Sequence, residues 1–506
     1  MTTFVDFEAF APLYDRGIPQ VVFTRLVADL ETPVSAMLKI ARHERYSLLL
    51  ESVEGGAVRG RYSIIGLRPD IIWRVRGNVA EINRKALIDT EGPFEVLAED
   101  PLTALRSLMA ESRIDLPANL PPMAAGVFGY MGYDMVGLME RLPEPGNDVL
   151  KVPDGILVRP TIMAIFDSIR DEVTIVTPVF PQDGVTAQAA FARANERLQE
   201  VVASLNRPLD HNLGDDSIAA PIAAPVSNTP PEDFRQMVRQ AQEYILAGDI
   251  FQVVLSQRFE TPFTLHPFSL YRALRRVNPS PFLYFLNFAD FSIIGSSPEI
   301  LVRVREGKVT IRPLAGTRPR GATPAEDKAR AEELLADPKE RSEHLMLLDL
   351  GRNDVGRVSK TGTVEVTDQF ALEFYSQVMH IVSNVEGELD DKFDAIAALV
   401  AGFPAGTVSG APKVRAMEII AELERDKRGP YAGCVGYFSA NGDMDTCIVL
   451  RTAIVKDGKM YVQAGAGVVA DSDPEAELQE CINKAKALFR AAEEAVRFAG
   501  EAGMGQ

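Results

Sequence analysis

Short runs of β-branched and aromatic residues, separated by Gly, Pro and Asp, constrain the fold of this chain most. Between Phe23 and Ile175, runs such as SLLLES, RYSIIG, IIWRV, TIMAIF and VTIVT have the length and spacing of strands in a largely antiparallel sheet. Two helical patterns interrupt them, one starting at Thr32-Pro33 and one covering Pro101 to Glu111. Further along, strands mix with inserted helices without regular alternation. This mixture predicts an α+β fold.

The stretch from Asn206 to Glu232 predicts a domain junction. It is rich in Pro, Ala, Asp and Ser and has no apolar period. A helix that ends near Leu205 precedes it, and a helix from Pro231 to Ala247 overlaps its end. We therefore expect an N-terminal domain over residues 1–205, a linker over 206–232 and a second domain after it.

The charge balance excludes several classes of partner. The 506 residues include 53 Lys and Arg against 71 Asp and Glu, a net charge of −18. Such a chain repels nucleic acid and anionic lipid unless basic residues are segregated, and no basic patch is evident. We therefore expect no nucleic-acid partner. A protein this acidic needs a metal ion or local arginines to bind a small anion.

Cysteine usage and hydropathy predict the compartment. The three cysteines have no CxxC spacing, and the N-terminal MTTFVDFEAF carries acids where a secretory signal would carry positive charge. No apolar run approaches the roughly eighteen residues of a membrane span. These features predict a soluble, cytoplasmic protein without a membrane partner.

Two predicted helices carry paired acids near their first turns. Each begins with Asp-Pro, at Asp337-Pro338 and at Asp473-Pro474, in which Asp caps the free amides and Pro needs no amide partner. The pairs Glu340/Glu343 and Glu477/Glu480 have a spacing of three, so each projects from one helical face and could bind a divalent cation. Oxygen ligands without His or Cys favour Mg²⁺ over Zn²⁺. Taken singly, each of these acids is more typical of a helix start than of a metal site, and Glu340 stands where a capping box places Glu.

Four other residues are candidates for a site, each with a structural alternative. Gly465 and Gly467 follow a predicted strand, where missing side chains let backbone amides approach an anion, although a bulge or turn fits too. Arg451, in the predicted strand IVLRTAIV, would clamp a carboxylate or lie on an exposed sheet face. His380, in VMHIVSN, is catalytic or a hydrogen-bonded core residue.

Several familiar catalytic motifs are absent from the sequence. It contains no Gly-x-Ser-x-Gly elbow, no phosphate loop ending in Gly-Lys-Ser/Thr and no His-Glu-x-x-His helix. A nicotinamide cofactor is disfavoured because Ala470 stands where its glycine fingerprint needs Gly. The residues alone therefore predict a Mg²⁺-assisted enzyme acting on a small carboxylate, without identifying the substrate.

The order of segments adds a resemblance. GDIFQVVLSQRF, NPSPF, IIGSSPE, PLAGT, KERSEHLMLLDLGRND, QVMHIVSNVEG, FPAGTVSGAPK, GPYAGCVGY, LRTAI and QAGAGVVADSDPEAELQECINKA together resemble the chorismate-utilising enzymes, and within them the large subunits of anthranilate synthases. The match covers about residues 233–495, the second domain, and leaves 496–506 as a C-terminal tail. Upstream, LLES, GRYSIIG and GVFGYMGYD resemble the N-terminal domain of those subunits. The resemblance implies antiparallel sheets in a β-sandwich flanked by helices, with a smaller β-rich regulatory region.

The resemblance also implies roles for named residues. Mg²⁺ would be bound by Glu343 and Glu480, with Glu340 and Glu477 as their partners, and would bind the ring carboxylate of chorismate. The implied substrate-binding residues are Gly316, Thr317, Tyr431, Arg451, Gly465, Gly467 and Lys484. The implied catalytic residues are Glu299, a general acid for the departing hydroxyl, His380, which acts in the elimination phase, Gln252 and Thr317. The reaction would join ammonia to chorismate and release pyruvate and anthranilate.

Two positions bear on the choice of subfamily. Water-using relatives carry a Lys where this chain has Gln252, and Gln cannot deprotonate water. Many aminodeoxychorismate synthases carry a nucleophilic Lys where PLAGT has Ala315. Anthranilate synthesis is favoured, while aminodeoxychorismate and 2-amino-2-deoxyisochorismate synthases stay open. A non-catalytic tryptophan-sensing subunit is the alternative from another class, and the intact acids, His380 and Arg451 argue against it.

The resemblance implies two further partners. The three cysteines are not in a Gly-x-Cys-x-Gly elbow, so a separate glutamine amidotransferase subunit would supply ammonia in a heterotetramer. L-Tryptophan would act as a feedback inhibitor. Its implied contacts are Leu50, Glu51, Ser52, Pro279, Ser280 and Pro281, which without the resemblance read as a strand end and a Pro-rich turn.

Overall fold

The computed structural model describes residues 5–54, 58–209, 221–375 and 378–500. Most of its helices begin at Pro, and several are capped by the preceding side chain, as for α8, where Asp337 accepts hydrogen bonds from Lys339 N at 2.9 Å and Glu340 N at 3.3 Å. The helices are α1 (Phe7–Tyr14), α2 (Pro33–Ile40), α3 (Pro101–Glu111), α4 (Ala187–Leu205), α5 (Pro231–Ala247), α6 (Pro267–Val277), α7 (Pro324–Ala336), α8 (Pro338–Gly356), α9 (Ala395–Gly402), α10 (Lys413–Leu423) and α11 (Pro474–Gly500). None of these described helices is long and apolar enough to cross a membrane.

The strands are joined by antiparallel pairing that divides into two series. Both series start from a central pair of long strands, β3 (Val58–Arg76) and β7 (Gly155–Asp167). On one side β7 also pairs with β8 (Glu172–Val179), and β8 pairs with β1 (Gln20–Val27). The short strands β4 (Val79–Asn83) and β5 (Glu95–Val96) extend the end of β3. The α+β fold with antiparallel sheets is confirmed.

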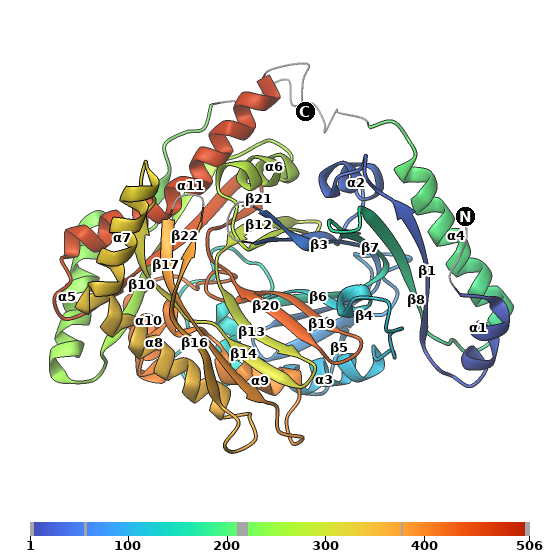
Figure 1. Ribbon diagram of the computed structural model, residues 1–506, viewed down its shortest axis with the longest axis horizontal. Helices are drawn as coiled ribbons and strands as arrows, with labels where there is room; N and C mark the ends of the chain where they lie inside the picture. The colour runs from blue at the N-terminus through green and yellow to red at the C-terminus, as the bar shows by residue number, and fades with distance from the viewer. Residues whose placement is uncertain (1–4, 55–57, 210–220, 376–377, 501–506) are drawn as a thin grey trace.

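The first series runs from β3 into the C-terminal half of the chain. Its strands, in spatial order after β3, are β2 (Ser47–Glu54), β11 (Phe282–Asn287), β12 (Phe291–Ser297), β21 (Thr452–Lys456), β22 (Lys459–Val468) and β10 (Gln252–Pro262), and the short strands β9 (Val226–Ser227) and β18 (Gly410–Ala411) pair with β10. Helices α5, α6 and α11 pack beside this series (Figure 1).

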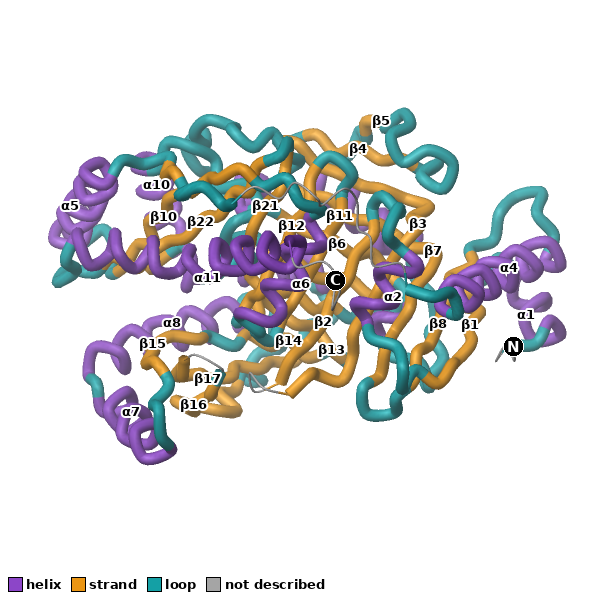
Figure 2. The backbone as a smooth tube through the Cα atoms, turned by 90° about the horizontal axis from the view of Figure 1, so that it is seen from above, coloured by secondary structure: helices purple, strands orange, loops and turns teal. Residues whose placement is uncertain are grey.

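The second series runs from β7 and ends beside α8. Its strands, in spatial order after β7, are β6 (Gly126–Met131), β19 (Cys434–Ser439), β20 (Met444–Ile448), β13 (Ile300–Arg305), β14 (Lys308–Ile311) and β17 (Val378–Glu388). Strands β15 (Leu314–Pro319) and β16 (Glu365–Phe374) pair with β17 on its two edges. Figure 2 shows the ends of the two series on opposite sides of α11, with β10 and β22 on one side and β15 to β17 on the other.

Strand pairing and the core both cross the predicted junction. Strand β2 pairs with β11, from Ser47 opposite Asn287 to Ser52 opposite Phe282, and β6 pairs with β19. One hydrophobic cluster joins Phe10 of α1 to Leu274 of α6 and Phe489 of α11. The division at residues 206–232 stays a prediction, and residues 210–220 of it lie outside the described residues.

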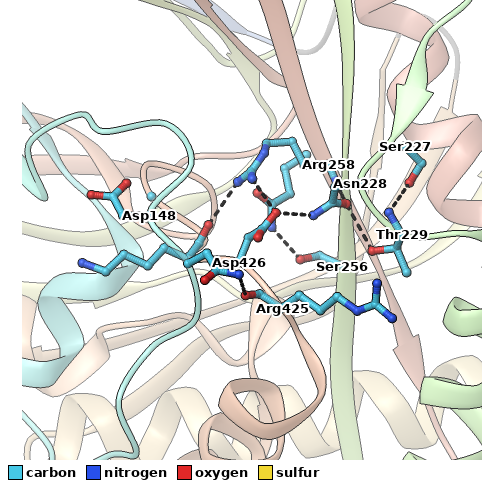
Figure 3. Close-up of polar contacts among 12 residues, drawn as sticks. Asp148, Ser227, Asn228, Thr229, Ser256, Arg258, Arg425 and Asp426 are labelled. Carbon is cyan, nitrogen blue, oxygen red and sulfur yellow. Dashed lines mark hydrogen bonds and ion pairs between the residues drawn. The ribbon is translucent and has the colours of Figure 1, made fainter.

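The described end of the predicted linker is attached to the second region by a polar cluster (Figure 3). The Asn228 side chain accepts a hydrogen bond from Arg258 N and donates one to Asp426, both at 2.8 Å. The buried Arg258 guanidinium also pairs with Asp426 at 2.8 Å. These contacts fix the chain as it enters α5.

Candidate active site

A cavity of about 960 Å³ lies where the two strand series converge, between α8 and α11. Every catalytic, substrate-binding and metal-binding residue expected from the sequence lines it, and so do Pro279 and Ser280. Strands β10 and β22 contribute Gln252, Gly465 and Gly467, whereas β15 and β17 contribute Gly316, Thr317 and His380. Residues from 252 to 484 in the sequence are therefore brought to one place, although their roles stay predictions.

The acids on α8 and α11 face the cavity from two sides. Glu343 Oε1 accepts a hydrogen bond from Gln252 Nε2 at 3.1 Å, Glu340 pairs with Arg318 at 2.7 Å, and Glu480 pairs with Lys484 at 2.6 Å. Burial raises the pKa of Glu343, and the nearby charges of Glu340 and Glu480 raise it further. Burial also raises the pKa of Glu477. Glu340 thus pairs with Arg318, whereas Asp337 caps the helix.

This donor set fits a hard divalent cation in kind. The four carboxylates line one cavity, and a cation would offset both the burial of the Glu343 charge and its repulsion by Glu340 and Glu480, which together raise the pKa of Glu343. Among the described residues, Gln252 Oε1 is buried without a hydrogen-bond partner, and the Nε2 of the same amide donates to Glu343. Within the described residues, no three His, Cys, Asp or Glu side chains are gathered closely enough to hold a metal ion. Lys484 and Arg318 hold two of the four acids instead.

Two titratable residues are held in opposite protonation states. Glu299 is only 5% exposed, and burial raises its pKa to about 8. Burial lowers the pKa of His380 to about 4. At neutral pH the carboxyl is therefore mostly protonated and the imidazole is neutral, so the cavity contains one proton donor and one proton acceptor.

A bulge in β15 fixes the tautomer of His380. The register between β15 and β17 shifts between Ala315 and Thr317, and Gly316 has φ of 80°, a conformation that favours glycine. Its carbonyl lies 3.2 Å from His380 Nδ1, and Thr317 Oγ1 lies 2.9 Å from the same atom. Because a carbonyl only accepts, Nδ1 carries the proton and Nε2 carries the lone pair.

Arg451 differs from its expected setting. It was expected inside a strand, but it lies between β20 and β21 with φ of 48°, a left-handed conformation that ends the ladder. Burial lowers the pKa of its guanidinium, and the charge of Glu480 opposes that shift. No ion pair within the described part of the chain engages Arg451, so its charge is available to an anionic ligand.

The two glycines of QAGAGVV also differ from expectation. They lie within β22, and not after it, opposite Ser256 and Val254 of β10. A Cβ on Gly467 would overlap the Gln252 amide, and one on Gly465 would lie 2.7 Å from Tyr431 Oη. Lys484 Nζ donates to the carbonyl of Gly465 at 2.9 Å. Glycine is needed here because two site side chains occupy the space above the strand.

A second cavity of about 790 Å³ adjoins the first. Leu50, Glu51, Ser52 and Pro281 line it, so the six expected tryptophan contacts divide between the two cavities. Glu51 is already engaged, since Tyr271 and Arg275 of α6 donate to its carboxylate at 2.5 and 2.6 Å. Ser52 Oγ donates to the carbonyl of Tyr62 at 3.1 Å.

The sequence reasoning missed two residues at the first cavity, Tyr375, which lines it, and Arg318, which pairs with one of its lining acids. Arg318 holds both Asp337 and Glu340, and Tyr375 packs against His380. A signal exists for each: Arg318 directly follows Thr317 in the chain, and Tyr375 ends the acid-aromatic run LEFY shortly before His380. Neither motif is specific enough to identify a site alone.

Comparison with known proteins shows the family of this chain. The sequence profile described as "chorismate binding enzyme" matches residues 68–490, and the chain belongs to that family. Within it, the chain is 56% identical over 501 residues to anthranilate synthase component 1 of Cereibacter sphaeroides, covering 99% of each chain. The corresponding protein of Aquifex aeolicus is 45% identical, covering 93% of this chain and 94% of its own.

Solved structures show the same fold. The crystal structure of anthranilate synthase component I from Streptococcus pneumoniae superimposes with a TM-score of 0.74 at 40% identity, covering 85% of this chain and 92% of that one. The menaquinone-specific isochorismate synthase of Escherichia coli, at 19% identity, has a TM-score of 0.68 and covers 96% of this chain and 98% of its own. The family and fold expected from the sequence motifs are therefore confirmed.

Proposed function

We propose that this enzyme converts chorismate and ammonia to anthranilate, pyruvate and water as the large subunit of an anthranilate synthase. The observation that carries the proposal is that a buried carboxyl, Glu299, and a buried imidazole, His380, line one cavity. Burial raises the pKa of the first and lowers the pKa of the second, which favours a protonated carboxyl and a neutral imidazole. Loss of the allylic hydroxyl needs a proton donor, and aromatisation needs a proton acceptor. The names of the relatives support this reaction.

Binding of the substrate would use the charged residues of the cavity. Arg451 and Tyr431 would hold the enolpyruvyl carboxylate, with Gly316 and Lys484 completing the pocket. Glu343 and Glu480, with Glu340 and Glu477, would hold Mg²⁺, whose charge would offset these acids at the ring carboxylate. Lys484 would have to release Glu480 for this to occur, because the two are paired at 2.6 Å.

The first chemical step would replace a hydroxyl by an amino group. Ammonia forms a bond to the ring carbon beside the ring carboxylate while the allylic C–O bond breaks, and the hydroxyl leaves as water with a proton from Glu299. Gln252 Oε1, which is buried and has no hydrogen-bond partner in the described part of the chain, would accept a hydrogen bond from ammonia and orient it. The proton that the new ammonium group loses restores Glu299.

The second step would make the ring aromatic. His380 Nε2 accepts the proton from the aminated ring carbon, the C–O bond to the side chain breaks, and that proton completes pyruvate at the enolpyruvyl methylene. Thr317 and the carbonyl of Gly316 keep Nε2 in the accepting tautomer. Atoms balance, since chorismate and ammonia give anthranilate, pyruvate and one water.

Two regulatory or supporting partners belong to the proposal. "Component 1" in the names of the relatives supports a second component, and we propose a glutamine amidotransferase subunit that supplies ammonia. We also propose that L-tryptophan binds near Ser52 and Pro281 in the second cavity and inhibits turnover. The large cavity, its apolar Leu50 and its arginines suit an aromatic amino acid.

The test is turnover by the purified chain with chorismate, Mg²⁺ and an ammonium salt, followed by anthranilate fluorescence. We expect anthranilate with ammonium but not with glutamine alone. An aminated product that keeps its pyruvyl ether, identified by chromatography and mass, would replace this proposal with an aminodeoxychorismate or 2-amino-2-deoxyisochorismate synthase. Tryptophan binding without any turnover would indicate a sensing subunit.

A further inference from the structure

The two cavities share a wall formed by Pro298, Glu299, Leu314 and Tyr375. Tyr375 matters most in this wall because its ring contacts His380. The ring centroids are 5.5 Å apart with an interplanar angle of 62°, an edge-to-face arrangement that aromatic rings favour. Thr317 and Gly316 thus hold the imidazole at Nδ1, and the ring of Tyr375 packs against it.

The position of Tyr375 is itself fixed from the second cavity. Its hydroxyl donates to Glu373 Oε2 at 2.6 Å, and the other oxygen of Glu373 forms a short ion pair with Arg312. Arg312 and Glu373 both line the second cavity and are about one-third exposed, at 33% and 29%. A continuous series of contacts therefore runs from Arg312 through Glu373 and Tyr375 to His380.

Backbone register places Glu373 opposite His380. The two residues face each other in the ladder between β16 and β17, and the charge of Glu373 opposes the lowering of the His380 pKa by burial. The carboxylate thus acts on His380 both directly and through the tyrosine. Its ion pair with Arg312 is the part of the series that a ligand in the second cavity can reach.

We propose that Tyr375 is a positioning residue for His380 and that Arg312 sets its position through Glu373. An anionic group bound in the second cavity that pairs with Arg312 would withdraw it from Glu373. The Glu373 carboxylate, which still accepts from the Tyr375 hydroxyl, would then be free to shift and would move the tyrosine ring away from the imidazole. This inference rests on the proposed function in that it requires His380 to take part in turnover. Through the shared wall, ligand binding in the second cavity would change the chemistry in the first.

Two substitutions of Tyr375 separate the ring from the hydroxyl. Tyr375→Phe keeps the ring and loses the anchor, so we expect kcat to fall about tenfold with KM within about twofold. Tyr375→Leu loses both, and we expect a fall of about a hundredfold. The control is Tyr244→Phe, which removes a similar hydroxyl-to-Glu422 bond of 2.7 Å between residues that line neither cavity and should leave kcat unchanged.

A second readout does not depend on turnover. The chain has only five histidines, so the ring of His380 can be followed by NMR in protein labelled at histidine. In Tyr375→Leu, water reaches the imidazole, and its pKa should rise from about 4 toward the ordinary value, with Tyr375→Phe in between. A merely structural role would lower the melting temperature without moving this titration.

Arg312→Gln tests the far end of the series. We expect kcat to fall about tenfold, to the level of Tyr375→Phe, and we expect the double variant to lose no more activity than either single one. The control is Arg74→Gln, which removes an ion pair of similar exposure, with Glu81 at 2.7 Å, outside both cavities. Parent-like kcat in Arg312→Gln, or additive losses in the double variant, would overturn the link through Glu373.

The outcomes distinguish this inference from the proposed function. If the parent protein makes no anthranilate, the proposed function fails, and the NMR titration still decides whether Tyr375 orients His380. An unmoved His380 titration in Tyr375→Leu, or equal losses of kcat in Tyr375→Phe and Tyr244→Phe, would overturn the positioning role while leaving the reaction intact.

Discussion

The two adjoining cavities differ in how their charges are balanced. In the second cavity the arginines have acidic partners: Arg61 pairs with Asp167 at 2.9 Å, and Arg303 pairs with Asp445 at 3.2 Å. In the first cavity Glu343 is held by an amide, and Arg451 has no carboxylate partner within the described residues. Uncompensated buried charge is costly and persists where function requires it. The contrast supports our proposal that chemistry takes place in the first cavity and ligand binding in the second.

The largest expected effect comes from removing an acid of the proposed Mg²⁺ site in the first cavity. Glu343→Gln and Glu480→Gln each keep the size of the side chain but remove a charge from the proposed Mg²⁺ site, so we expect turnover to fall by about a thousandfold or more. Anthranilate fluorescence at varied Mg²⁺ measures this loss, and circular dichroism checks the fold.

The control for that prediction is Glu475→Gln. Glu475 lies on the same helix as Glu480 but pairs with Arg235 outside the cavity. It should keep parent-like turnover. If Glu343→Gln and Glu480→Gln were as active as this control at ordinary Mg²⁺, the four acids would only stabilise the starts of their helices. The first cavity would then contain no Mg²⁺ site.

The next largest effect concerns the proton donor. We expect Glu299→Gln to lower kcat by about a hundredfold to a thousandfold because an amide cannot supply the proton. In the parent, turnover should fall as the pH rises through about 8, where Glu299 loses its proton, and as the pH falls through about 4, where His380 gains one. In the variant, the fall in turnover at low pH should remain and the fall at high pH should disappear. An unchanged fall at high pH would assign that fall to another group.

How much of the structure can be predicted from the sequence depends on how far apart in the chain the interacting residues are. Helix starts are local, so Thr32-Pro33, Asp337-Pro338 and Asp473-Pro474 all mark helices correctly, and Asp473 accepts from Ala476 N at 2.9 Å. The pairing of β2 with β11 joins residues more than two hundred positions apart. The hydrophobic pattern of β2 or of β11 does not specify its partner, because many apolar strands have the same pattern.

In the candidate site, too, local features could be predicted from the sequence and long-range ones could not. The acids on α8 and α11 could be predicted as pairs because helical spacing puts them on one face, and motif resemblance brought the two pairs together. The left-handed backbone at Arg451 could not be predicted, since IVLRTAIV alternates like a strand. The link through Tyr375 depends on contacts across β16 and β17, which only the register of the folded sheet reveals.

A moderate effect should follow from closing the space above β22. Gly467→Ala places a Cβ against the Gln252 amide, which must move away from Glu343, and we expect kcat to fall about tenfold. Gly137→Ala is the control, because a Cβ there meets nothing within 4 Å. Steady-state kinetics and thermal melting of both variants separate the two effects. Parent-like kcat in Gly467→Ala would show that the position of Gln252 is not critical.

The smallest effect on basal turnover is expected in the second cavity. Ser52 lines that cavity, and its hydroxyl donates to the carbonyl of Tyr62 at 3.1 Å. In Ser52→Phe, the larger ring would fill space that the indole or ammonium group of tryptophan needs, so inhibition should weaken by about tenfold or more while uninhibited kcat stays within about twofold. Titration of both proteins with tryptophan at fixed chorismate gives the two inhibition curves.

Each outcome of that titration bears on the contrast between the cavities. Because ligand binding and chemistry are proposed to be separate, losing tryptophan binding removes the bias toward a less active state without touching Glu299 or His380. Unaltered inhibition would place the inhibitor elsewhere, and Pro279 and Ser280 in the first cavity would become the candidates. A parallel loss of uninhibited turnover would mean that Ser52 supports the pairing of β2 with β3 and β11, so that the second cavity stabilises the first mechanically.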